Sequence, residues 1–272
     1  MCAGGSPALR AQRRAVGAGR PLAYNPLVRT ADAHAILLTV GDEITAGDVE
    51  NTNGSWLARR LADAGVSIRM LAAVPDDVGE IGRFIRERRG ECELMIVTGG
   101  LGGTPDDVTR EGIAEAFDVG VAEHPEAAAV LRAHFGDRLG DYARRFAMLP
   151  EGAVPIRNPL GGAPGFSIEN VHALPGVPAE MRATFGELEQ RLGGAARAPI
   201  RSVRLMYSTT ESEIVAVLEG VSDRHPDVAV GSYPLFEDGA KRVEIVLKSS
   251  DDRALEEAAS WLSGAVDEVL SA

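Results

Sequence analysis

The residues best suited to chemistry lie in one short segment, Gly99-Gly100-Leu101-Gly102-Gly103-Thr104-Pro105-Asp106-Asp107. Glycines let backbone N–H groups approach an oxyanion with no Cβ in the way, and a helix that begins after the segment adds its positive end. This pattern predicts a phosphate- or nucleotide-binding turn between a buried strand and a helix. The alternative is a plain tight turn, although such a turn needs only one or two glycines.

Two carboxylates, Asp106 and Asp107, close this segment. Because bare carboxylates repel a phosphate, the pair indicates magnesium or a similar hard cation that is bound partly by substrate oxygens. The segment is not a Walker A loop, since no Gly-Lys-Ser/Thr follows, and it lacks the third glycine of Gly-x-Gly-x-x-Gly. Each aspartate could instead cap the helix that follows.

Several other polar residues have both a functional and a structural interpretation. Asp42 and Glu43 could complete a metal site or cap a turn. Asn53 could contact a ligand or cap a helix, and Glu180 could face the pocket or complement a helix dipole. The spacing of the five histidines matches neither metal ligands nor a nucleophilic site, so we interpret them as surface or packing residues: His34, His124, His134, His172 and His225.

Strands and helices alternate along residues 35–117, which predicts a doubly wound parallel sheet. Apolar runs at 35–40, 66–74 and 94–98 predict strands, and a helix follows each of them. Parallel strands joined by right-handed crossovers place their following loops at one edge of the sheet, where ligands of such folds bind. Residues 41–43, 75–76 and the glycine segment should therefore converge there.

After residue 125 the sequence no longer alternates regularly between strands and helices. Residues 125–148 are expected to be helical, 166–168 and 171–174 to be short strands, and 179–192 to be a helix. After a linker at 193–199, strands at 202–207, 228–233 and 242–247 and helices at 210–218 and 251–270 predict a small α+β domain. We therefore expect an α/β domain over residues 34–193 and an α+β domain over residues 200–272.

Charge and hydropathy exclude several classes of function. The net charge of −12 disfavours nucleic acid as the main partner, and no apolar run is long enough to cross a membrane. With only two cysteines, of which Cys92 is expected to be buried, a reducing cytoplasm fits. Residues 1–33 lack the apolar core of a secretory signal, so we expect a disordered tail or a misplaced start site.

Six short motifs occur in a fixed order along the chain and together closely resemble the CinA (competence/damage-inducible protein A) family. They are Gly41-Asp42-Glu43, Asn51-Thr52-Asn53, Val74-Pro75-Asp76-Asp77, the segment from Gly99 to Thr109, Gly162-Ala163-Pro164-Gly165, and Leu174-Pro175-Gly176-Val177-Pro178-Ala179-Glu180-Met181. The resemblance covers roughly residues 35–192, and the segment after residue 200 is similar to the small KH-type domain of this family.

The resemblance implies a three-layer α/β/α domain with a mainly parallel sheet, similar to the molybdopterin-binding domains of MoaB, MogA and MoeA. It also implies metal-dependent hydrolysis of a dinucleotide diphosphate, notably ADP-ribose, and a similarity to a domain of eukaryotic FAD synthases. By position, Asp76 and Asp107 match the functional aspartates of the superfamily. A divalent cation (Mg²⁺, Mn²⁺ or Co²⁺) is expected at Asp42, Glu43, Asp106 and Asp107. Substrate contacts are expected from Asn53, Gly99, Gly100, Gly102, Gly103, Thr104, Gly165, Pro175, Gly176 and Glu180.

At two points the sequence departs from the family pattern, and there the expectations drawn from the resemblance change. Gly103 stands where the family usually has proline, so the loop is expected to be more flexible. The chain ends at Ala272, without the nicotinamide-nucleotide amidase domain of many members, so deamidation is not expected. The small domain is acidic and lacks a Gly-x-x-Gly loop, so we expect it to cover the crevice or to form a dimer contact and not to bind RNA.

Two functions remain open from the sequence. One is a metal-dependent hydrolase that cleaves ADP-ribose or a related dinucleotide, with the glycine segment holding the diphosphate. The other is a protein that binds molybdopterin, a pterin phosphate, without hydrolysing it. In both cases the partner is a small phosphorylated molecule, and self-association is expected.

Overall fold

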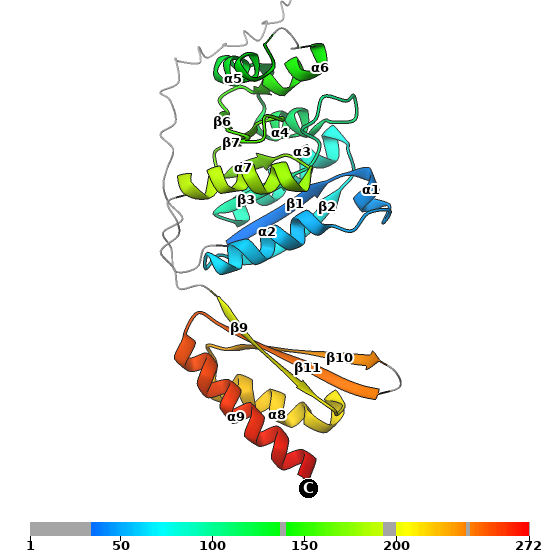
Figure 1. Ribbon diagram of the computed structural model, residues 1–272, viewed down its shortest axis with the longest axis vertical. Coiled ribbons are helices and arrows are strands. Elements are labelled where there is room, and N and C mark those ends of the chain that lie inside the picture. The colour runs from blue at the N-terminus through cyan, green and yellow to red at the C-terminus, as the bar shows by residue number, and fades with distance from the viewer. Residues whose placement is uncertain (1–33, 137–139, 193–199, 238–239, 272) are drawn as a thin grey trace, which may run out of the picture.

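The computed structural model describes residues 34–136, 140–192, 200–237 and 240–271. Residues 34–192 and 200–271 each build a sheet with its own helices (Figure 1). The expected tail at residues 1–33 and the expected linker at 193–199 lie outside the described residues.

The first sheet contains six strands in the order β2-β1-β3-β8-β7-β6. Its parallel part consists of β1 (His34–Val40), β2 (Ser67–Val74), β3 (Leu94–Thr98) and β8 (Val171–Leu174). The next strand, β7 (Gly165–Ile168), runs antiparallel to β8 and to the edge strand β6 (Val154–Ile156). The mainly parallel α/β sheet expected from the sequence is confirmed.

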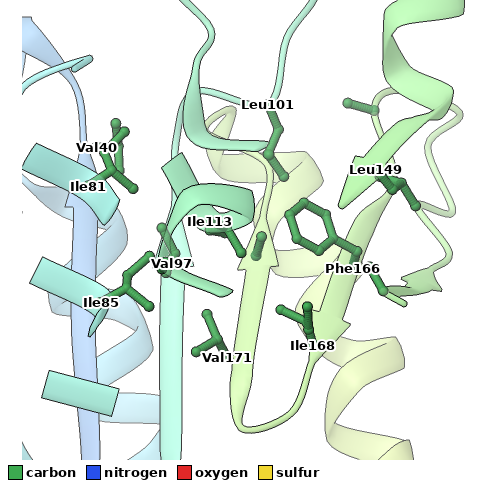
Figure 2. Close-up of a cluster of buried hydrophobic side chains, with 14 of the residues drawn as sticks. Val40, Ile81, Ile85, Val97, Leu101, Ile113, Leu149, Phe166, Ile168 and Val171 are labelled. Carbon is green, nitrogen blue, oxygen red and sulfur yellow. The ribbon is translucent and has the colours of Figure 1, made fainter. Parts of the chain in front are cut away.

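Helices cover both faces of this sheet and make a three-layer domain. On one face lie α2 (Thr52–Asp63) and α7 (Pro178–Arg191), whose apolar side chains pack with Ala35 and Leu37 of β1. On the other face, α3 (Val78–Arg88), α4 (Thr109–Phe117) and α5 (Pro125–Phe135) share a hydrophobic cluster with Ile36 and Leu38. Figure 2 shows part of this cluster, including Ile81 and Ile113. Successive residues of β1 thus enter opposite cores, as the alternation of side chains along a strand requires.

The single helix expected over residues 125–148 is wrong, because the chain breaks at glycines. Helix α5 ends at Gly136, which adopts a φ of 55°. A short α6 (Asp141–Arg144) follows Gly140 and continues into a 3₁₀ turn, Arg145–Ala147. The chain then forms β5 (Met148–Pro150), which pairs with β4 (Val121–Glu123). Strands of three residues are too short to show an alternating pattern in the sequence.

The second sheet has the order β10-β11-β9 and is antiparallel throughout. It is formed by β9 (Arg201–Tyr207), β10 (Ala229–Glu237) and β11 (Ala240–Ser249). Helices α8 (Glu211–Arg224) and α9 (Asp252–Ser271) share one apolar core with it. The expected β-α-β-β-α order is confirmed, and α8 extends beyond the expected end at residue 218. Among the residues that the structure describes, no helix combines the length and the apolar character needed to cross a bilayer.

Candidate functional site

A cavity of about 370 Å³ opens at the carboxyl ends of β1, β2 and β3. Its wall includes α1 (Asp42–Thr45), the start of α2 and the loop between β3 and α4. Eight residues expected at the site line this cavity: Glu43, Asn53, Asp76, Gly99, Gly100, Asp106, Asp107 and Gly176. Loops that are far apart in the sequence therefore meet where the parallel sheet predicts.

The glycine loop, residues 99–107, begins with a turn that only glycine fits. Gly99 and Gly100 have φ angles of 108° and 61°, in the left-handed region that disfavours side chains. A Cβ on Gly99 would lie 2.1 Å from the carbonyl oxygen of Val40, so β1 and the loop pack backbone against backbone. This close approach brings the loop to the edge of β1 and into the cavity wall.

Asp107 closes the glycine loop from within. Its Oδ1 accepts a hydrogen bond from the Gly102 N–H at 2.8 Å, and its Oδ2 accepts from the Thr104 N–H at 2.9 Å and from the Thr104 hydroxyl. The expectation that Asp106 or Asp107 caps α4 is wrong, because the N-cap is Val108, which makes no side-chain cap. The Asp107 carboxylate is thus bound by N–H groups of the glycine loop and does not cap α4.

Two arginines and a buried leucine hold the glycine loop in place. The buried Arg110 guanidinium donates to the carbonyl oxygens of Leu101 at 2.5 Å and Gly102 at 3.0 Å, and Arg145 donates to that of Gly103 at 3.0 Å. Burial lowers the pKa of Arg110 to about 10. The Leu101 side chain is 1% exposed and enters the core near Ile113 and Phe166 (Figure 2).

Asp42 and Asp76 join the ends of β1 and β2. The Asp42 N–H donates to Asp76 Oδ2 at 2.9 Å, and the Asp76 N–H donates to Asp42 Oδ1 at 3.1 Å. Burial raises the pKa of Asp76, and the negative charges of Asp42, Glu43 and Asp106 raise it further, while the hydrogen bond from the Asp42 N–H opposes them. The cavity thus holds one carboxyl group, that of Asp76, whose ionisation is disfavoured.

Asn53 anchors the turn that precedes α7. Its Nδ2 donates to the Gly176 carbonyl oxygen at 2.7 Å, and Thr98 at the end of β3 donates to that of Pro175 at 2.8 Å. A Cβ on Gly176 would lie 3.2 Å from the Gly99 Cα. These contacts hold the turn against the glycine loop and leave Gly176 at the cavity wall.

The charge of the cavity is entirely negative. Glu43, Glu50, Asp76, Asp106 and Asp107 line it, and none of its lining residues is lysine, arginine or histidine. In the part of the chain that the structure describes, no three His, Cys, Asp or Glu residues are arranged to hold a metal ion by themselves. A cation here would have to share its ligands with a bound molecule.

The remaining expected site residues do not line the cavity. Asp42 lies just behind Asp76, and Gly102, Gly103, Thr104 and Pro175 belong to the two supporting turns. Gly165 is in β7, where a Cβ would lie 2.6 Å from the Ala173 carbonyl oxygen. Glu180 accepts a hydrogen bond from Asn158 at 2.8 Å. The structure therefore does not bring Gly165 and Glu180 together with the other expected residues.

Sequence reasoning missed the supporting residues and part of the wall. Asn51 caps α2 by accepting a hydrogen bond from the Gly54 N–H at 2.9 Å, and it also lines the cavity. Glu50 and Thr52 line it as well. The motif at residues 51–53 was the available signal for this wall. Arg110 and Arg145 gave none, because their partners are backbone carbonyl groups.

The chain matches two known protein families. The family described as "Probable molybdopterin binding domain" matches residues 36–193, and the family described as "FAD synthase, middle domain" matches residues 199–271. A solved structure of CinA from Thermoplasma acidophilum, described as a protein with unknown function, is 34% identical with a TM-score of 0.55. The match covers 58% of this chain and 98% of that one.

Relatives extend the similarity across both parts of the chain. A protein of Archaeoglobus fulgidus is 37% identical over 199 residues, which cover 73% of this chain and 85% of that protein. A CinA-like protein of Frankia casuarinae is 38% identical over 239 residues, which cover 80% of this chain but 54% of the relative. The chain thus spans about half the length of that relative. The chain belongs to the family of probable molybdopterin-binding domains, in which it is a CinA-like member, and its second domain matches the FAD synthase middle domain.

Proposed function

We propose that the chain is a hydrolase that cleaves a nucleotide diphosphate such as ADP-ribose with the help of a divalent cation. The observation that carries the proposal is the composition of the cavity: five carboxylates line it, two of them from the glycine loop itself, and no cationic side chain lines the wall. A diphosphate placed there without a cation would be repelled. A divalent ion between the carboxylates and the diphosphate removes this repulsion, and hard cations prefer such oxygen ligands.

The residues present fit such an ion when the substrate completes its ligands. Glu43, Asp76 and Asp106 line the cavity from three different segments of the chain, and Asp42 adjoins them through its hydrogen bonds to Asp76. The neighbouring negative charges that raise the pKa of Asp76 are the kind of field that a cation would relieve. When bound, the ion would offset charge on the diphosphate oxygens.

Hydrolysis then requires water to be placed against one phosphorus atom. The water oxygen forms a new bond to phosphorus, the bridging P–O bond breaks, and the leaving phosphate takes the bonding electron pair. We assign Asp76, whose pKa is raised by burial and by neighbouring negative charges, the role of holding this water or accepting its proton. Asp107 keeps the glycine loop in shape, so we assign it a positioning role in the same step.

A hydrolysis assay tests this proposal directly. The protein is incubated with ADP-ribose and Mg²⁺, Mn²⁺ or Co²⁺, and nucleotides are separated by chromatography. We expect AMP to be released only when a cation is present, and we expect Asp76→Asn to abolish the release. Asp63→Asn, on the exposed end of α2, serves as the matched control and should retain activity. Equal release by Asp76→Asn and the unchanged protein would overturn the proposal.

Binding of a pterin phosphate without hydrolysis is the second candidate. It is favoured by the description of the family that matches residues 36–193. The glycine loop would hold the phosphate in the same way, and no water would be activated. Tight retention of a pterin phosphate, together with no AMP release under any cation, would favour this function over hydrolysis.

A further inference from the structure

One aromatic ring is exposed beside the glycine loop. Tyr142 of α6 is 56% exposed, whereas every other Phe, Trp or Tyr side chain described between residues 34 and 192 is buried or half-buried. Its ring packs edge-on against Phe146, with ring centroids 5.2 Å apart and an interplanar angle of 70°. An exposed ring that is held by a buried one has a fixed orientation, so it loses little freedom when a ligand stacks on it.

Tyr142 lies directly on the tip of the loop. A Cβ on Gly103 would lie 2.6 Å from the Tyr142 carbonyl oxygen and 2.7 Å and 2.9 Å from two of its ring carbons. Any side chain at position 103 would therefore push α6 away. Arg145, which follows α6, donates to the Gly103 carbonyl oxygen at 3.0 Å and holds the two segments together. The absence of a side chain at Gly103 thus permits this contact.

The loop connects Tyr142 to the cavity. Gly100 and Asp106 line the cavity from the two arms of the loop, and Gly103 lies between them in sequence at the tip. In Figure 1, α6 and the segment before α4 lie along the same edge of the domain as α1. No residue that lines the cavity is aromatic, so the cavity itself offers no stacking surface for a flat ring.

We infer that Tyr142 stacks against the planar heteroaromatic ring of the ligand, while its phosphate part occupies the cavity. The inference rests on the proposed function, because it takes the glycine loop as the phosphate site. Stacking of a base on an aromatic side chain contributes about 1–3 kcal/mol, or roughly five- to a hundredfold in affinity. Tyr142 and Gly103 together would then select ligands that carry such a ring over bare phosphates.

The test compares ligands with and without a ring. Binding of ADP-ribose, of a pterin monophosphate and of inorganic pyrophosphate is measured by calorimetry with Mg²⁺ present, on the full chain. We expect Tyr142→Leu to weaken the binding of at least one ring-bearing ligand about tenfold, with pyrophosphate binding unchanged. Tyr142→Phe should restore the affinity. Tyr233→Leu, which removes a similarly exposed tyrosine from β10, is the matched control and should leave the binding of all three ligands unchanged.

The three ligands distinguish failure of the stacking role from failure of the proposed function. They also distinguish a nucleobase from a pterin as the ring that Tyr142 contacts. The ligand that loses affinity identifies the ring as a nucleobase or a pterin. Gly103→Ala should reproduce the selective loss by displacing Tyr142. Unchanged binding of both ring-bearing ligands by Tyr142→Leu would overturn the stacking role while pyrophosphate binding still supports the cavity. If the unchanged protein bound none of the three, the proposed function would fail and the stacking role with it.

Discussion

The Asp76 carboxyl group is partly buried at the candidate site, and its pKa is raised. Burial is the main cause of its raised pKa, and the charges of Asp42, Glu43 and Asp106 add to it. A raised pKa means that the folded protein favours the protonated form. The stability that this gives is present below the ordinary value of 3.8 and is lost as the pH rises through the raised pKa. At neutral pH, the ionised group therefore opposes folding.

Asp76→Asn should consequently stabilise the metal-free protein at pH 7. The amide oxygen of asparagine can still accept the hydrogen bond from the Asp42 N–H, while the repulsion from the neighbouring carboxylates is removed. We expect a higher Tm for the variant without cations, and a smaller rise in Tm when Mg²⁺ is added. Calorimetry of both proteins with and without Mg²⁺ measures this. A lower Tm for the metal-free variant would contradict this electrostatic account.

Arg110 should control the loop through its two hydrogen bonds to carbonyl oxygens. Arg110→Met keeps much of the buried volume but leaves the Leu101 and Gly102 carbonyl groups without these donors, which costs about 1–3 kcal/mol for each unsatisfied buried group. We expect weaker pyrophosphate binding as well as lower stability. Arg83→Met on the exposed face of α3 provides the comparison. Full pyrophosphate affinity in Arg110→Met would show that Arg110 is not needed for the glycine loop to bind the ligand.

Single residues of the site were predictable only in part. Gly99 and Asp106 could be named because their types and their positions after a strand indicate chemistry, whereas Asp76 was named through the family resemblance. The true partners of Asp107 could not be named, since a carboxylate before a helix usually caps it. Here the loop folds back, and its own N–H groups reach the carboxylate first.

At the scale of elements, the glycine loop depends on the core beneath it. Leu101 is its apolar anchor, and it joins the same cluster as Leu149, which is equally buried at 1% exposure but lies in β5. Removing either side chain should cost about 2–5 kcal/mol of stability. The two positions differ in that only Leu101 belongs to the loop that faces the ligand.

Leu101→Ala and Leu149→Ala therefore form a matched pair. We expect both variants to lose similar stability in urea unfolding, and only Leu101→Ala to lose affinity for pyrophosphate. The measurement is made below the unfolding midpoint of both variants, so that each remains folded. Equal loss of affinity in the two variants would show that the core acts on the site as a whole, and not through Leu101.

The arrangement of elements was largely predictable, and the exceptions have physical reasons. Long apolar runs such as residues 35–40 and 94–98 become buried parallel strands. The segment after residue 125 could not be divided correctly, because its apolar residues keep a helical spacing while Gly136 turns the chain. The short strands β4, β5 and β6 take their conformation from the strands beside them.

For the whole molecule, a buried histidine sets a limit on stability in acid. His172 lies in β8, 4% exposed, and its Nδ1 is 2.7 Å from the Ser167 Oγ. Burial, and then the positive charge of Arg191, lower its pKa to about 4. The neutral ring is favoured in the folded state, so its contribution to stability is complete above the ordinary value of 6.5 and is lost as the pH falls through about 4.

His172→Asn should remove this dependence. The pKa difference corresponds to roughly 3 kcal/mol, so the unchanged protein should lose about that much more stability than the variant between pH 7 and pH 4. Urea unfolding of both proteins at the two pH values gives the difference. Parallel losses in the two proteins would mean that His172 is not buried as a neutral ring.

The most direct test of the whole account is a calorimetric titration of the full chain with ADP-ribose, in Mg²⁺ and in a chelator. The cavity has no cationic lining, so a diphosphate should need the divalent ion in order to bind. We expect clear binding in Mg²⁺, none in the chelator, and a loss of the Mg²⁺-dependent binding in Asp76→Asn. Equally tight binding of ADP-ribose with and without a divalent cation would contradict the account.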